Sequence, residues 1–202
     1  LLVILAIGWL LPANVSAQTT YFPAKGVYNG FLDQTNIVEC DNNNSQAVSI
    51  TLEMQQSGGA VVATHGFAVN GFGSAHIILN GLASIANTYG VYTLTLGAGQ
   101  QLLGDRVNCR TAFYRNADSN SGKQFEYAYA LPVQNPQIGK LSGVYNSFDP
   151  SGTASITHNW LSVINFDSTP LTATVSVFRA DGTLLQNVPI SALPPSGRVD
   201  IP

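Results

Sequence analysis

Two cysteines carry the clearest chemistry in this 202-residue chain. Cys40 and Cys109 both fall in stretches that predict β-strands, far apart along the sequence. In an oxidising compartment such thiols pair, and on the chain-entropy model a bridge closing so long a loop stabilises the fold by about 4 kcal/mol. The alternative is a nucleophilic thiol, which needs a local base, and no histidine is close to either cysteine in the sequence. We therefore predict a disulfide between Cys40 and Cys109.

The loop that follows Cys40 is a candidate calcium site. Asp41, Asn43 and Ser45 place oxygen-bearing side chains at alternate positions, as the opening of a calcium-binding loop does. Against this interpretation, Gln46 stands where an EF-hand needs glycine, and Leu52 where it needs a bidentate glutamate. A polar turn between strands is the favoured interpretation. Calcium is the one cofactor considered, and a second polar loop, Asp118 to Gly122, has the same ambiguity.

Aromatic side chains offer a second kind of binding chemistry, because exposed rings can stack on sugars. Tyrosine and phenylalanine total 17 residues. Phe125, Tyr127 and Tyr129 alternate along one predicted strand, and we expect this row to fill the core. For three other tyrosines the neighbouring residues do not settle which face is buried. The candidate ligand-binding residues are therefore Tyr89, Tyr92 and Tyr114.

The remaining polar residues form no catalytic or metal-binding motif. The three histidines have no metal-ligand spacing and share no short motif with cysteine or glutamate; they are His65, His76 and His158. Folding could pair two carboxylates for glycoside hydrolysis, but no spacing selects a pair; the candidates are Glu39, Asp41, Glu53 and Asp105. We predict that the chain is not an enzyme and has no catalytic residues.

These residues must be positioned by β-strands. From Val48 to Gln55, apolar residues alternate with polar ones, and the run ends at Gly58-Gly59, which predicts a half-buried strand leading into a hairpin. The same pattern returns from Leu171 to Phe178 and closes at Asp181-Gly182. No helical periodicity of useful length follows the N-terminal segment. The fold class predicted is all-β, with antiparallel β-sandwich modules in tandem.

The copied unit extends beyond one strand. Residues 35–67 align with residues 158–190 without a gap, which sets Asn42 opposite Asn165 and keeps the inward apolar positions. Upstream, residues 26–29 recur as residues 143–146. Downstream, residues 74–79 are paired with residues 196–201, so that Arg198 replaces His76 as a solvent-facing side chain. Trp160 takes the position of Ile37 and is expected to anchor the core of the second copy.

The first copy continues through three further predicted strands, residues 89–96, 106–114 and 125–131, which have no counterpart after the second. We predict a first module over residues 18–134, a proline-containing linker over 135–140 and a second, incomplete module over 141–202. A half sandwich leaves strand edges and a core face uncovered, which proteins avoid. The sequence is therefore predicted to be a C-terminally truncated fragment.

The N-terminus predicts export. Residues 1–11 are almost all apolar, and Val15-Ser16-Ala17 carries small residues at the positions read by a signal peptidase, so cleavage is expected after Ala17. Asn14 and Ser16 arrive too early for a membrane span of about 20 apolar residues. Charged residues are 9% of the chain and its net charge is −3, so no basic stripe is available for nucleic acid. The mature chain is expected in the periplasm, outside the cell or on its surface.

The alternating strands, glycine-containing hairpins and long-range disulfide resemble the immunoglobulin-like sandwiches found in tandem on bacterial exported and cell-envelope proteins. The chain departs from antibody-type domains because no tryptophan lies between the cysteines and Val107 stands two residues before Cys109. The resemblance implies a structural or adhesive role with protein or polysaccharide partners at a cell surface. The alternative is a carbohydrate-binding module of a larger secreted enzyme.

Overall fold

The computed structural model describes residues 22–117, 124–137, 141–143 and 160–202. The predicted signal peptide, the second polar loop and His158 lie outside these residues. Within them the chain is all-β, as predicted: twelve strands form four antiparallel sheets. The described helices are three short 3-10 turns, η1 (Phe31–Asp33), η2 (Leu79–Gly81) and η3 (Gln101–Arg106), and none is long and apolar enough to cross a membrane.

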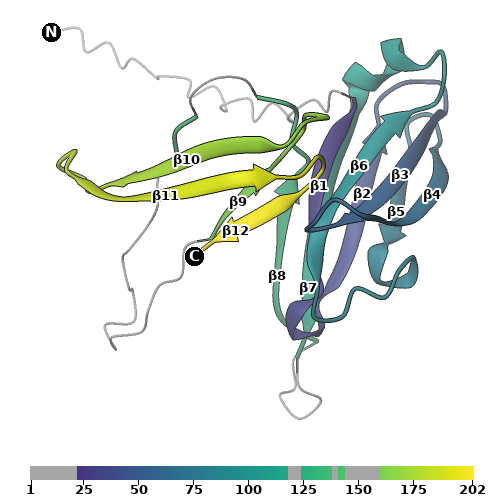
Figure 1. Cartoon of the computed structure of the whole chain (residues 1–202). Helices are drawn as coiled ribbons and strands as arrows, with labels where there is room; N and C mark the ends of the chain where they lie inside the picture. Colours follow the sequence, from purple (N-terminus) through teal and green to yellow (C-terminus); the bar gives the residue numbers. More distant parts are fainter. Residues whose placement is uncertain (1–21, 118–123, 138–140, 144–159) are drawn as a thin grey trace, which may run out of the picture.

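The first module is a sandwich of two four-stranded sheets (Figure 1). One sheet has the order β1-β6-β3-β4, from β1 (Ala24–Asn29), β6 (Tyr89–Leu96), β3 (Val48–Gln56) and β4 (Val61–Val69). The other has the order β5-β2-β7-β8, from β5 (Ser74–Ile78), β2 (Thr35–Asn42), β7 (Val107–Asn116) and β8 (Phe125–Pro132). The strands expected at 89–96, 106–114 and 125–131 are therefore present.

Alternation along the strands explains the core of the first module. Ile50, Leu52 and Met54 of β3 are at most 1% exposed, while Ser49 and Thr51 on the opposite face of the strand are exposed to solvent. Val38 of β2 covers them from the opposite sheet as part of one buried cluster. The apolar face of β3, which the sequence predicts to point inward, is therefore the buried face.

The predicted disulfide is formed inside this core. Cys40 and Cys109 are direct partners across β2 and β7, and their Cα atoms lie 4.2 Å apart. The bridge joins positions separated by 69 residues, so it ties an early strand to a late one. Such a bridge fits an oxidising, extracytoplasmic location.

The second module contributes two two-stranded sheets. β10 (Leu171–Phe178) pairs with β11 (Leu184–Leu193), and β9 (Leu161–Ile164) pairs with β12 (Arg198–Ile201). In chain order, β9, β10, β11 and β12 correspond to β2, β3, β4 and β5 of the first module. There too the middle two strands pair with each other, β3 with β4, and the outer two pair with each other, β2 with β5. In Figure 1 the β10–β11 ribbon extends away from the eight-stranded sandwich.

Hydrogen bonds bear out the copied unit. The Asn42 side-chain amide donates to the carbonyls of Gln46 (2.8 Å), Val69 (3.1 Å) and Asn70 (3.2 Å). The Asn165 amide donates in the same way to the carbonyls of Thr169 (2.8 Å), Leu193 (3.0 Å) and Pro194 (3.2 Å). Each asparagine is 1% exposed, and each ties the end of one hairpin to the strand beside it. The two copies therefore share their local chemistry.

Two details of the predicted alignment are wrong. Asp41 pairs with Ser74 and Ile164 pairs with Arg198, so Arg198 is the counterpart of Ser74, two positions from His76. The cause is one extra residue in the second copy, at a bulge in β11, where Ala173 pairs with Ile190 but Leu171 pairs with Leu193. Trp160 is 65% exposed and does not anchor a core, because its counterpart Ile37 lies on the outward face of β2.

The aromatic row of β8 also differs from its prediction. Phe125 is 38% and Tyr129 43% exposed, so the row does not fill the core. The reason is position: β8 is the last strand of its sheet and has a neighbouring strand, β7, on one side alone. Tyr129 stacks on the buried ring of Phe113, with centroids 4.7 Å apart, and lies beside the ring of Tyr127.

Candidate functional site

The side chains of the candidate calcium loop form hydrogen bonds with one another and with the neighbouring strand. The exposed residues Asp41 and Asn43 interact with each other, since the Asn43 amide donates to Asp41 Oδ2 at 3.3 Å, and the Asn108 amide donates to the same oxygen at 3.2 Å. Ser45 is exposed on the turn. The buried members are instead Asn42 and Asn44, whose side chains hold the turn to the strands. This arrangement is that of a polar structural turn.

The three candidate tyrosines do not form a common site. Tyr92 is fully buried and its hydroxyl lies 2.7 Å from that of Thr111, so its ring cannot stack on a ligand. Burial raises the pKa of Tyr92 well above its usual range. Tyr114 is half-buried against Phe125 of β8, whereas Tyr89 on β6 lies beneath the guanidinium of Arg198.

In the part of the chain that the structure describes, no group of three or more His, Cys, Asp or Glu side chains is placed to hold a metal ion. Glu39 accepts a hydrogen bond from Arg110 Nε at 2.6 Å, and His65 stacks near Phe67 at the β4 edge. Each of these residues thus has a structural neighbour.

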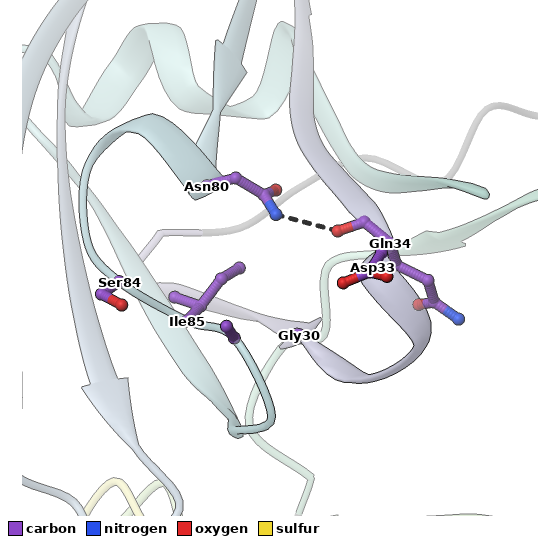
Figure 2. Close-up of a pocket in the computed structure, with 7 residues that line it drawn as sticks. Gly30, Asp33, Gln34, Asn80, Ser84 and Ile85 are labelled. Carbon is purple, nitrogen blue, oxygen red and sulfur yellow. Dashed lines mark hydrogen bonds between the residues drawn. The ribbon is translucent and has the colours of Figure 1, made fainter. Parts of the chain in front are cut away.

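A pocket of about 280 Å³ lies at one end of the first module (Figure 2). Its rim is held by amides: Asn80 Nδ2 donates to the Gln34 carbonyl at 2.8 Å, and the fully buried Asn36 donates to the same carbonyl at 3.0 Å. Among the described side chains, Gln34 Oε1 is the one buried polar atom without a partner. The lining residues include Gly30, Asp33, Gln34, Asn80, Ser84 and Ile85.

The described residues that line the pocket do not form a catalytic arrangement. Its carboxylate, Asp33, is exposed, and its hydroxyl, Ser84, has no described histidine among the lining residues to act as a base. The Gln34 amide points to β8, where its Nε2 donates to the Tyr127 hydroxyl at 2.6 Å. The polar groups therefore hold the turn of η1 in place, and no nucleophile, base and oxyanion donor converge there.

The most elaborate polar cluster lies between the two modules and is centred on Arg198. Its Nη1 donates to the carbonyls of Tyr28 and Gly90, both at 2.9 Å, and its backbone N–H donates to the Ser57 carbonyl at 2.9 Å. Its Nε and Nη2 donate to the two carboxylate oxygens of Asp200, both at 2.7 Å. Arg198 is only 7% exposed. We call these contacts, with those of Lys25 and Gly59 below, the inter-module junction.

The guanidinium suits this position physically. Its planar fork satisfies one carboxylate and two carbonyls at once, and it stacks 5.2 Å from the centre of the Tyr89 ring. Asp200 neutralises the buried charge from within the second module. Breaking such a pair by removing one partner leaves a buried charge and costs about 3 kcal/mol or more.

Lys25 makes a second contact across the junction. Its Nζ donates to Thr93 Oγ1 in its own module at 2.7 Å and to Ser196 Oγ of the second module at 2.9 Å. It also lies 5.6 Å from the centre of the Phe166 ring. Burial lowers the pKa of Lys25, and Glu53 partly offsets this shift. The lysine therefore bridges the modules from β1.

Gly59 allows a close backbone approach at the third contact. It has φ of +85° at the β3–β4 turn, and a Cβ at this position would collide with the carbonyl oxygen of Pro195. Its counterpart Gly182 has φ of +84° in the second module, but a Cβ there would meet open space. Only the first of the two turns is used by the junction.

Comparisons with protein-family models, with curated proteins and with solved structures gave no match for this chain.

Sequence reasoning placed Arg198 in solvent and missed the junction. The available signal was the pair Arg198 and Asp200, two residues apart and therefore on one face of a short strand. Neither Tyr28 nor Gly90 could have been identified as a partner, because Arg198 contacts their backbone carbonyls and carbonyls carry no sequence signature.

Proposed function

We propose that this chain is a non-enzymatic structural segment of an exported or cell-surface protein, in which immunoglobulin-like modules are held at a fixed mutual orientation. The observation that carries the proposal is the buried Arg198, whose guanidinium and backbone contact Tyr28, Gly90 and Ser57 of the first module. A freely jointed pair of modules needs no such cluster.

The contacts come from different elements of the first module, which supports a spacing role. Arg198 reaches β1, β6 and the end of β3, while Lys25 and Gly59 contact the turn around Pro195 and Ser196. Contacts spread over three elements oppose rotation as well as separation. The disulfide fits an extracytoplasmic setting for such a segment.

Spin labels attached to cysteines at exposed positions 64 and 191 would test the fixed orientation by pulsed dipolar spectroscopy. The proposal predicts one narrow distance distribution for the parent protein. Arg198→Ala broadens the distribution because the carbonyls of Tyr28 and Gly90 lose their donor. Arg198→Lys also broadens it, since an ammonium cannot hold Asp200 in a bidentate pair and both carbonyls together.

Arg179→Ala is the matched control, because Arg179 is exposed in the same module and lies outside the junction. This variant should keep the parent distribution. A broad distribution in the parent protein, or a narrow one in Arg198→Ala, would refute the rigid-spacer proposal.

The β8 aromatic row supports carbohydrate binding as a second candidate function. Phe125 and Tyr129 are both more than a third exposed, and Tyr127 lies beside Tyr129 with ring centroids 6.2 Å apart. Sugar rings stack on such surfaces. Retention on immobilised polysaccharides should then be lost in Tyr129→Ala and kept in Phe72→Ala, where the ring is 76% exposed on a separate turn. Equal retention of both variants would count against this candidate.

A further inference from the structure

Three Asn-Gly pairs in this chain have the residue types needed for spontaneous deamidation. In such a pair the backbone nitrogen of the glycine attacks the side-chain carbonyl carbon of the asparagine, because glycine has no Cβ to obstruct the approach. The reaction is fastest when the asparagine amide and the glycine N–H are both free of hydrogen bonds. The pairs begin at Asn29, Asn70 and Asn80, and the structure gives them different surroundings.

The pair Asn29-Gly30 is held by hydrogen bonds on both reacting groups. Asn29 Oδ1 accepts from the Phe31 N–H at 2.9 Å. The Gly30 N–H, whose nitrogen would have to attack, donates to the Thr88 carbonyl at 2.8 Å. Both bonds must open before the amide of Asn29 is attacked.

The side chain of Asn80 is held at both of its polar atoms. Asn80 Oδ1 accepts from the Asn36 N–H at 2.7 Å, and Asn80 Nδ2 donates to the Gln34 carbonyl at 2.8 Å (Figure 2). These contacts fix the amide against β2, so Asn80 is protected in the folded chain.

Asn70 lacks this protection. It is exposed at the β4–β5 turn, and its side-chain amide makes no hydrogen bond to the described part of the chain. The Gly71 N–H likewise donates to no described residue. Backbone bonds hold the turn instead, since the Gly73 N–H donates to the Asn70 carbonyl at 3.0 Å and the Phe72 N–H donates to the Asn44 carbonyl at 2.8 Å. The reacting groups are therefore free although the turn itself is fixed.

The copied turn in the second module shows that this turn does not require an Asn-Gly pair. Ser196, with φ of +55°, takes the place of Phe72, with φ of +53°. The Gly197 N–H donates to the Pro194 carbonyl at 2.9 Å, as in the first turn. Pro194 and Pro195 stand where the first turn has Asn-Gly, and neither has a side-chain amide. The same turn is thus built in one module with a reactive pair and in the other without it.

We propose that Asn70 is a deamidation site that modifies the β4–β5 turn. The Gly71 nitrogen forms a bond to Asn70 Cγ, the bond from Cγ to Nδ2 breaks, and ammonia leaves with the proton of the Gly71 N–H. Water then opens the resulting cyclic imide. Cleavage between the nitrogen and Cγ gives aspartate, and cleavage between the nitrogen and the backbone carbonyl carbon gives isoaspartate, in which the chain continues through the side chain.

The isoaspartate product should loosen the turn. It adds a methylene to the chain and converts the former Asn70 carbonyl into a carboxylate outside the chain. That carbonyl accepts from Asn42 Nδ2 at 3.2 Å and from the Gly73 N–H. Both bonds depend on the present path of the backbone, so the modified turn is tied less firmly to β2. This inference does not depend on the spacer proposal.

Peptide mapping of the aged, oxidised chain by mass spectrometry tests the proposal. In mildly alkaline buffer, aspartate and isoaspartate should accumulate at Asn70 about tenfold faster than at Asn29 or Asn80, because those two react only after hydrogen bonds open. Asn70→Gln is the matched variant, since its longer side chain forms the imide ring much more slowly. It should suppress the modification there and leave the other two sites at their parent rates.

The same chain in urea is the control for intrinsic reactivity. The three pairs consist of the same two residue types, so they should react at similar rates once the fold is lost. If Asn70 in the folded protein reacts no faster than Asn29 and Asn80, although all three react in urea, the turn protects it and the proposal is wrong.

Amide exchange measures the consequence for the turn. In protein that carries isoaspartate at this position, the N–H groups of Phe72 and Gly73 should exchange faster than in the unmodified protein. The Gly197 N–H in the copied turn is the control and should keep its rate. Unchanged exchange at Phe72 and Gly73 would contradict the loosening of the turn.

Discussion

The two modules contain the same hairpin unit, but among the residues that the structure describes only those of the first enclose a complete core. Asn42 and Asn165 make matching hydrogen bonds, and Gly59 and Gly182 have φ values of +85° and +84°. The inward residues of β3 are nevertheless fully buried, whereas those of β10 are half-buried. Local turn chemistry therefore fixes how the strands pair, and it does so without a closed core on every side.

The difference also shows what the first module gains from its additional strands. β6 pairs with β3 in one sheet and β7 pairs with β2 in the other, and β7 carries the second cysteine. The second module instead relies on the junction, where Arg198 and Ser196 contact β1 and its neighbours. Its stability is thus expected to depend on the first module, while the converse is not expected.

Removal of the disulfide should produce the largest difference in stability between the two modules. Replacing both Cys40 and Cys109 by alanine should cost the first module about 4 kcal/mol, because the loop between them is no longer closed in the unfolded chain. Urea unfolding followed by circular dichroism gives the free energy. Val163→Ala, at the Cys40 position of the second module, is the control and should leave the first module's transition in place. A loss below about 1 kcal/mol for the double variant would contradict the expected role of the bridge.

Replacing the equivalent asparagine in either module should destabilise that module, and the two losses should be similar. Asn42→Ala and Asn165→Ala each leave several buried backbone groups without a partner, at a cost of about 3 kcal/mol. Native-state amide exchange in β3 and β10 measures the two losses separately. If Asn165→Ala leaves exchange in β10 unchanged while Asn42→Ala accelerates it in β3, the two turns are not equivalent in energy.

Alanine substitutions at Gly59 and Gly182 distinguish the effect of turn geometry from the effect of the junction contact. Gly182→Ala should cost about 1 kcal/mol, because a residue with a Cβ must adopt positive φ. Gly59→Ala carries the same cost and also pushes the Pro195 carbonyl away, so it should release the second module as well. Exchange rates of the amides around Ser196 report that release. Identical rates in the two variants would show that the approach of Pro195 to Gly59 is not needed.

Alkaline pH should act on the first module through its tyrosines, and this effect vanishes near neutral pH. Burial raises the pKa of Tyr28, Tyr92 and Tyr129. Above about pH 10 the unfolded chain ionises these groups before the folded chain does, so the free energy of unfolding falls as pH rises. Tyr92→Phe should make the fall shallower in urea titrations at pH 9 to 11. An unchanged slope would show that Tyr92 ionises alike in both states.

Much of this architecture could be predicted from the sequence, because it follows from alternation and turn residues. The strand at 48–55, its copy at 171–178 and the Cys40–Cys109 bridge depend on local pattern or on a single pair of residues. The expectation that Phe125, Tyr127 and Tyr129 are core residues was wrong because alternation gives the face of a strand but not its place in the sheet. β8 is an edge strand, and only the topology shows it.

The junction could not be predicted for a different reason. Arg198 is bound by backbone carbonyls and by one carboxylate, and its position depends on one inserted residue that shifts β12 relative to its counterpart β5. Pattern matching placed this residue opposite His76 and hence in solvent. The pocket beside Asn80 was equally hidden, since its rim consists of amide contacts to main-chain groups.

Hydrogen exchange at the inter-module junction tests most directly whether Arg198 holds the second module to the first. In the parent protein, the Arg198 amide bonded to Ser57 and the amides of β12 should exchange slowly. Arg198→Ala should make these amides exchange faster, while amides in the turns around Asn42 and Asn165 keep their parent rates. Unchanged protection of β12 in Arg198→Ala, with the protein folded, would contradict the account.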